Sequence, residues 1–251
     1  MRIISKYFLV SLKKNFAYRV NGYLVILDTM MDILAIWLFW VSLLELELNL
    51  IGWTRQSLKL FMGYSLISSS IANLFVGEWD LQDHVLDGSL DGYLLKPCSA
   101  VLLILLERAN FLRFLVSFPV GAVMVFAYAG QQPLLALRGM ILCILASVMV
   151  QLIILAVYEL CFWLQRVDGF VDLLETVLSI SKYPLAFFPH KIALFFTYIV
   201  PIAWIGTIPV EIITGKTIAW SVPAFLILSI GICSLVHILW QAGRRNYESA
   251  N

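Results

Sequence analysis

Two aspartates, Asp28 and Asp32, lie four residues apart in a stretch that is otherwise apolar. On a helix this spacing places both carboxylates on one face. A carboxylate near the centre of a bilayer costs about 2.5–3.5 kcal/mol on insertion scales, so a cation or a wet cavity has to offset it. Three interpretations are open: an ion pair with Arg108 or Arg113, a cation-attracting lining of a transport path, or a protonated carboxyl without a role.

A second group of polar residues lies in the stretch 77–97, GEWDLQDHVLDGSLDGYLLKP. It is too charged to cross lipid and too apolar to be a free loop. Leu86, Leu90 and Leu94 recur at helical spacing, which predicts an amphipathic helix. The other face carries four aspartates: Asp80, Asp83, Asp87 and Asp91. Such a helix either caps the bundle at the membrane interface or docks a partner in the cytoplasm.

The sequence contains none of the common catalytic motifs. It has no H-E-x-x-H, no G-x-S-x-G and no Gly-rich phosphate loop. Gly215-Lys216-Thr217 resembles the end of a nucleotide-binding loop, but Val210 stands where that loop needs glycine. The four cysteines are widely spaced, without the C-x-x-C spacing of a metal or redox site. We therefore expect no catalytic residue, no metal site and no bound ATP in this chain.

The composition indicates that most of this chain faces lipid. Of its 251 residues, 61% are hydrophobic and 13% are charged, against about 45–50% and about 25% in soluble domains. This argues against a water-soluble enzyme. The net charge of +1 provides no basic surface for a nucleic acid. We expect one integral membrane domain over residues 1–251, with membrane lipid as its surroundings.

The apolar runs predict an all-α polytopic fold, because about 20 residues suffice for one helical crossing. Residues 1–20 alternate an apolar stripe with lysines and arginines, as in a helix that lies in the headgroup plane. Six transmembrane helices are expected, over residues 22–44, 57–77, 102–129, 134–164, 169–187 and 219–241.

Four prolines make the region before the last span irregular, since each removes a backbone donor. We expect a re-entrant hairpin over 190–213, within an outer segment 188–214. One later span over 183–205 is the alternative. With a cytoplasmic N-terminus and six crossings, eleven lysines and arginines fall inside and four outside. This bias predicts that both termini are cytoplasmic.

The run 85–97, VLDGSLDGYLLKP, resembles the signature I-x-x-G-x-L-D-x-Y-L-L-[RK]-P of ABC-2-type exporter permeases. These are the six-span permeases that lack a nucleotide-binding domain of their own. A second match combines Y-P and F-P at residues 183–189 with the later prolines at 201 and 209, and is similar to a proline pattern of that family. Ser89 departs from the acidic residue often found there. The resemblance covers essentially the whole chain in span count and order.

The resemblance implies the permease half of an exporter in a bacterial inner membrane. Two permeases, identical or related, would pair and recruit two separate ATPase subunits that hold ATP and Mg. The residues that would couple to the ATPase are Asp87, Gly88, Leu90, Asp91, Tyr93, Leu94, Leu95, Lys96 and Pro97. The alternative is a self-sufficient ion-coupled carrier or channel, in which Asp28, Asp32 and His237 would relay charge.

Overall fold

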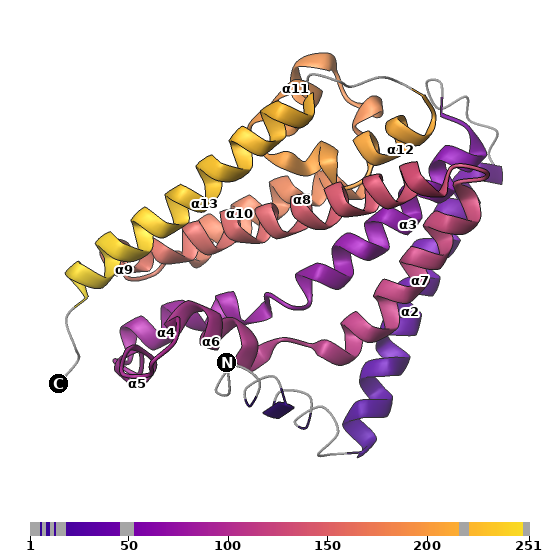
Figure 1. Cartoon of the computed structure of the whole chain (residues 1–251). Coiled ribbons are helices and arrows are strands. Elements are labelled where there is room, and N and C mark those ends of the chain that lie inside the picture. The colour runs from indigo at the N-terminus through magenta and orange to yellow at the C-terminus, as the bar shows by residue number, and fades with distance from the viewer. Residues whose placement is uncertain are drawn as a thin grey trace.

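The computed structural model describes residues 6, 9–10, 13, 19–45, 53–215 and 221–247, and the secondary structure in this part is helical throughout. The interfacial helix expected over 1–20 falls mostly outside these residues. Five long helices form the bundle (Figure 1). They are α2 (Arg19–Glu45), α3 (Arg55–Ala72), α7 (Phe111–Tyr128), α8 (Pro133–Glu159) and α13 (Ser221–Asn246).

Four of the described helical stretches are long and apolar enough to cross a membrane: Gly22–Ser42, Phe111–Tyr128, Pro133–Leu164 and Val222–Asn246. A fifth crossing is obtained if α3 and the helical turns at Val76–Leu86 form one span bent by 45°. By length and composition, the described residues therefore provide four or five of the six crossings that the sequence predicts.

The span expected over 102–129 is wrong as one helix, because the chain breaks between α6 (Ala100–Arg108) and α7. Asn110 causes the break: its side chain accepts a hydrogen bond from the backbone N–H of Arg113 at 3.1 Å and so caps α7. The backbone N–H of Asn110 donates to the carbonyl of Asn73, 2.8 Å away, where α3 ends. The bends after α3 and before α7 are therefore joined.

Beyond these bends, four short helices gather at one end of the bundle (Figure 1). In η1, a Cβ on Gly77 would meet the carbonyl of Ile104 and lie 2.8 Å from the Cα of Leu105. Only glycine allows this approach of η1 to α6. The four are η1 (Val76–Trp79), α4 (Asp80–Leu86), α5 (Asp91–Leu94) and α6.

The fifth span expected over 169–187 is not a single helix. Its regular part, α10 (Asp168–Leu178), has 11 residues and is about 17 Å long at 1.5 Å per residue, against a bilayer core of about 30 Å. The turn η2 (Ser179–Lys182) continues α10. Tyr183 is then extended, as steric clash with the following proline requires.

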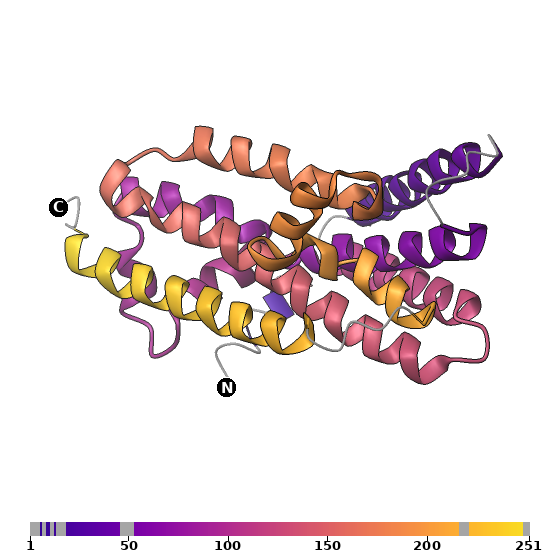
Figure 2. The same ribbon diagram turned by 90° about the horizontal axis from the view of Figure 1, so that it is seen from above.

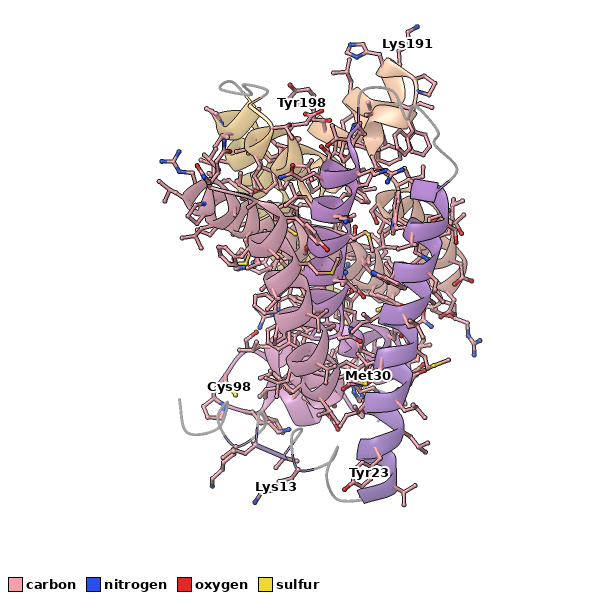
Figure 3. The ribbon with its side chains drawn as sticks, turned by 90° about the vertical axis from the view of Figure 1, so that its right-hand side faces the viewer. Lys13, Tyr23, Met30, Cys98, Lys191 and Tyr198 are labelled. Atoms are coloured by element: carbon pink, nitrogen blue, oxygen red, sulfur yellow. The ribbon has the colours of Figure 1, made fainter. Side chains whose placement is uncertain are left out.

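The expected hairpin region contains three short helices: α11 (His190–Tyr198), η4 (Pro201–Trp204) and α12 (Thr207–Ile213). The alternative single span over 183–205 is wrong, since η3 (Leu185–Phe187), α11 and η4 are separate. This region lies at the end of the bundle opposite the α4–α5 group. Figure 3 shows Lys191 and Tyr198 at one end, and Cys98 and Tyr23 at the other.

The helix α8 occupies the centre of the bundle, between α13 and α10 (Figure 2). The helices α3 and α7 approach each other closely at two glycines. A Cβ on Gly63 would lie 2.9 Å from the Cγ2 of Val125, and one on Gly121 would lie 2.8 Å from the carbonyl oxygen of Gly63. Small residues are what allow apolar helices to pack closely within a membrane.

Candidate functional site

The two aspartates of α2 both contact Arg113 at the start of α7. One guanidinium nitrogen forms an ion pair with the Oδ2 of Asp28, and the other lies 3.3 Å from the Oδ2 of Asp32. Arg108 does not join them, because its Nε lies 2.7 Å from the Oδ2 of Asp80 in α4. Arg113 thus fastens α2 to α7. When all three groups are ionised, their charges sum to −1.

These aspartates do not line an enclosed cavity within the described part of the chain. The side chains of Asp28 and Asp32 are 56% and 61% exposed, while that of Arg113 is 28% exposed. The carboxylates therefore lie on the outer surface of the α2–α7 pair, where lipid or another chain would contact them.

At the opposite edge of the same end lies what we call the coupling segment, residues 78–97. It is two short helices, not one, because Gly88 adopts a φ of 77° and ends α4. This left-handed conformation favours glycine. The turn is fixed by Ser89, whose N–H donates to Asp87 at 2.8 Å and whose hydroxyl lies 2.6 Å from Nδ1 of His84.

The turn also stabilises the charged form of Asp87, which lies outside the apolar helices. Hydrogen bonds from the hydroxyl and the N–H of Ser89 lower the pKa of the Asp87 carboxyl below its usual range. Both bonds favour the charged form, so the negative charge that Asp87 presents at the surface of the coupling segment persists to lower pH than that of an ordinary aspartate.

The leucines of the coupling segment point in opposite directions. Leu90 is fully buried in the core of this chain, and Leu94 is partly buried beside it. Leu95 is 87% exposed and Leu86 is 40% exposed. Leu90 therefore stabilises the segment from inside. Of the leucines in the segment, Leu86 and Leu95 are the ones that a partner could contact.

The remaining expected residues support this arrangement. The hydroxyl of Tyr93 donates a hydrogen bond to the Glu107 carboxylate in α6. The Lys96 ammonium lies 4.4 Å from the centre of the Tyr93 ring, within the range of a cation–π contact. Gly92 and Pro97 are exposed. Tyr93 thus holds α5 against α6, Lys96 packs on the Tyr93 ring, and the outer edge of the segment stays accessible.

One residue that sequence reasoning missed is Gln82 in α4, which is 5% exposed. Its Oε1 accepts from the N–H of Val167 at 2.7 Å, and its Nε2 lies 3.0 Å from both carboxylate oxygens of Asp168. A glutamine in a polar helix does not by itself indicate a buried contact. Its partners follow 85 and 86 residues later, so the sequence carried no signal for them.

At the far end of the bundle is a pocket of about 280 Å³. Apolar side chains such as Leu185 and Phe188 form part of its wall, and four polar ones complete it: His190, Thr197, Thr207 and Glu211. Its size suits a small polar molecule or the head of an amphiphile. It lies between η3, α11, η4 and α12.

Sequence reasoning also missed Glu159, a buried carboxyl at the end of α8. Glu159 has no exposed surface, and neither of its oxygens has a hydrogen-bond partner among the residues that the structure describes. No salt bridge to Glu159 is found among the described residues.

A helical bundle with four or five apolar helices of spanning length, and a polar helical segment at one end, is an integral membrane protein. The sequence pattern of the family described as "ABC-2 family transporter protein" matches residues 29–251. The chain belongs to this family, which confirms the resemblance carried by residues 85–97. It is thus a permease, the membrane component of a transport system. No curated protein sequence matches it.

Proposed function

We propose that this chain is the permease subunit of an ATP-driven exporter in a bacterial inner membrane. It pairs with a second permease, identical or related, and two ATPase subunits supply ATP hydrolysis with Mg. In this arrangement both termini are cytoplasmic, and the chain from α10 to α12 provides the remaining crossing, the fifth in chain order. Membership of the ABC-2 family supports a partnership with ATPase subunits in general.

The observation that carries the proposal is the outer edge of the coupling segment. Leu95, 87% exposed, and Leu86 provide apolar anchors, while Asp83 and Asp87 are exposed acidic groups beside them. Removing an exposed leucine side chain from water is favourable, and at the polar end of a membrane bundle a partner's apolar pocket can provide that burial. A groove with basic groups around an apolar floor fits this edge by charge.

The test uses the full chain, isolated from its native membrane together with bound ATPase subunits and reconstituted in liposomes. Leu95→Ser should lower the amount of co-purified ATPase, and the ATP hydrolysis that vanadate inhibits, at least tenfold. Because Leu95 contributes little to the core, thermal stability should be unchanged. Leu134→Ser is the matched control: Leu134 is 61% exposed at the start of α8, and both measurements should stay at their original values.

Two outcomes would contradict this function. In one, Leu95→Ser retains ATPase binding and hydrolysis at the level of Leu134→Ser. In the other, the isolated chain transports a solute across liposomes without any ATPase, which would favour the ion-coupled carrier.

For Asp28 and Asp32, the contact with Arg113 supports a role in assembly rather than in the transport path. If so, replacing both aspartates with asparagine should weaken the attachment of α2 and reduce the yield of assembled permease. Normal assembly combined with lost export would instead identify them as a lining of the path. Assembly is measured by size-exclusion chromatography, and export in liposomes that contain the ATPase.

A further inference from the structure

The segment of residues 167–185, which we call the connecting segment, is fastened at both ends by buried side chains. At its start, the N–H of Val167 donates to the Oε1 of Gln82 at 2.7 Å. At its end, the N–H of Leu185 donates to the Oγ1 of Thr207 at 3.0 Å. Gln82 and Thr207 are 5% and 6% exposed. These two bonds join the connecting segment to elements at opposite ends of the bundle.

The first attachment leaves the coupling segment little freedom relative to α10. The amide of Gln82 uses both of its polar atoms, since Nε2 also contacts Asp168 at 3.0 Å. Val167 is fully buried. If α4 moved alone, a buried N–H and a buried amide would lose their partners, and leaving buried polar groups unsatisfied is unfavourable. Movement of α4 therefore takes the start of α10 with it.

Between its attachments, the connecting segment is a nearly continuous rod. α10 passes directly into η2, so residues 168–182 are helical without a break. Val171 and Leu178 are buried in the same core as α8. In both views α10 runs along α8, away from the coupling segment (Figure 1, Figure 2). A rod of this kind transmits an axial displacement.

The second attachment forms part of the wall of the pocket at the far end. Leu185 and Thr207 both line it. The neighbouring η4 is fixed in turn, because Trp204 donates from its Nε1 to the carbonyl of Thr197 at 3.1 Å and stacks on Phe225 with ring centres 4.5 Å apart. Because the neighbouring wall is held in place, a displacement of Leu185 changes the shape of the pocket.

We propose that the connecting segment transmits movements of the coupling segment to this pocket, and that Gln82 and Thr207 are the positioning residues at its two ends. The source of the movement, ATPase closure, rests on the proposed function. The mechanical link belongs to this chain alone and can be tested without an ATPase.

The test measures amide hydrogen exchange of the full-length chain in lipid nanodiscs. Gln82→Glu places a carboxylate against Asp168, so exchange should increase about tenfold at Val167 and also at Leu185. Adding Asp168→Asn restores a donor opposite the new carboxylate and should return both amides to their original rates. Gln56→Glu is the matched control: Gln56 donates to the carbonyl of Tyr128, away from the connecting segment, and should change neither amide.

A reciprocal variant covers the case in which Gln82→Glu does not fold. Thr207→Val keeps the shape of the side chain and removes the acceptor, so exchange at Leu185 should increase directly, and exchange at Val167 should follow. A change confined to the neighbourhood of either substitution would overturn the inference.

A second arm separates this inference from the proposed function. In liposomes with the ATPase bound, ATP should alter exchange at Leu185 in the original chain and not in Gln82→Glu. If no ATPase binds, the proposed function fails, while the exchange results on the isolated chain still decide the link.

Discussion

The contact between α3 and α7 predicts that Gly63→Ala separates the two helices. The new Cβ would lie 2.9 Å from the Cγ2 of Val125, about 0.5 Å less than the 3.4 Å at which ordinary contact begins. It would also lie 3.1 Å from the carbonyl oxygen of Gly121 and 3.1 Å from the backbone nitrogen of Val125. A side chain can rotate away, but these backbone atoms cannot, so the helices themselves must move.

Overpacking of this kind costs about 1–3 kcal/mol, and the higher helix propensity of alanine offsets up to about 1 kcal/mol. Gly231→Ala in α13 is the matched control, because a Cβ there meets nothing within 4 Å. Both glycines lie inside apolar helices, so the propensity gain is common to the two variants. We therefore expect Gly231→Ala to be more stable than Gly63→Ala by about 1–3 kcal/mol.

Thermal unfolding in detergent micelles, followed by far-UV circular dichroism, measures this difference. A chain of this size shifts its midpoint by about 2–4 °C for each kcal/mol. Adding Val125→Ala to Gly63→Ala removes the Cγ2 contact and leaves the two backbone contacts, so it should recover only part of the loss. Equal midpoints for Gly63→Ala and Gly231→Ala would refute the reasoning.

Three further predictions concern single groups. Leu90→Ala should lower the free energy of unfolding by about 2–5 kcal/mol, since the side chain is fully buried. Leu95→Ala should change it by less than about 0.5 kcal/mol. The same thermal unfolding measurement compares the two variants, and equal losses would contradict the opposite orientations of these leucines. Glu159→Met should raise the free energy of unfolding by about 1–3 kcal/mol, because it removes a buried carboxyl without a partner among the described residues. A lower free energy of unfolding would instead show that the carboxyl has a stabilising partner. Ser89→Ala should raise the pKa of Asp87 part of the way towards its ordinary value, since the hydroxyl bond is lost while the backbone N–H of residue 89 still donates. In the unmodified chain, the stabilisation of the fold by ionised Asp87 is fully present above the ordinary pKa of an aspartate and fades as the pH falls through the lowered pKa. In Ser89→Ala this stabilisation should therefore fade at a higher pH. Carboxyl-carbon chemical shifts measure this titration, and an unchanged pKa would contradict it.

The sequence identified the most regular helices because length and apolar content suffice for them. The expected spans over 22–44 and 134–164 correspond to α2 and to α8 with α9 (Cys161–Leu164). The expected span over 102–129 went wrong because hydropathy does not register a cap: the apolar run continues across Asn110, but its side chain starts a new helix there.

The same limit explains the orientation of the leucines in the coupling segment. Their helical spacing placed Leu86, Leu90 and Leu94 on one face, on the assumption of a continuous helix. Gly88, with its φ of 77°, ends that helix and restarts the chain in another direction, so Leu90 enters the core and Leu95 becomes the exposed group. The glycine was visible in the sequence, but the sign of its φ was not.

The sequence by itself determined that this is a membrane-embedded permease of the ABC-2 family, because composition, apolar run length and the motif at 85–97 are local properties of the chain. Only the tertiary structure decided that Arg113, and not Arg108, holds Asp28 and Asp32, and that Gln82 meets Val167. These partners are 80 or more residues apart. Which side chains meet at such separations depends on helix packing and on the bends that direct each helix, and no local pattern records either.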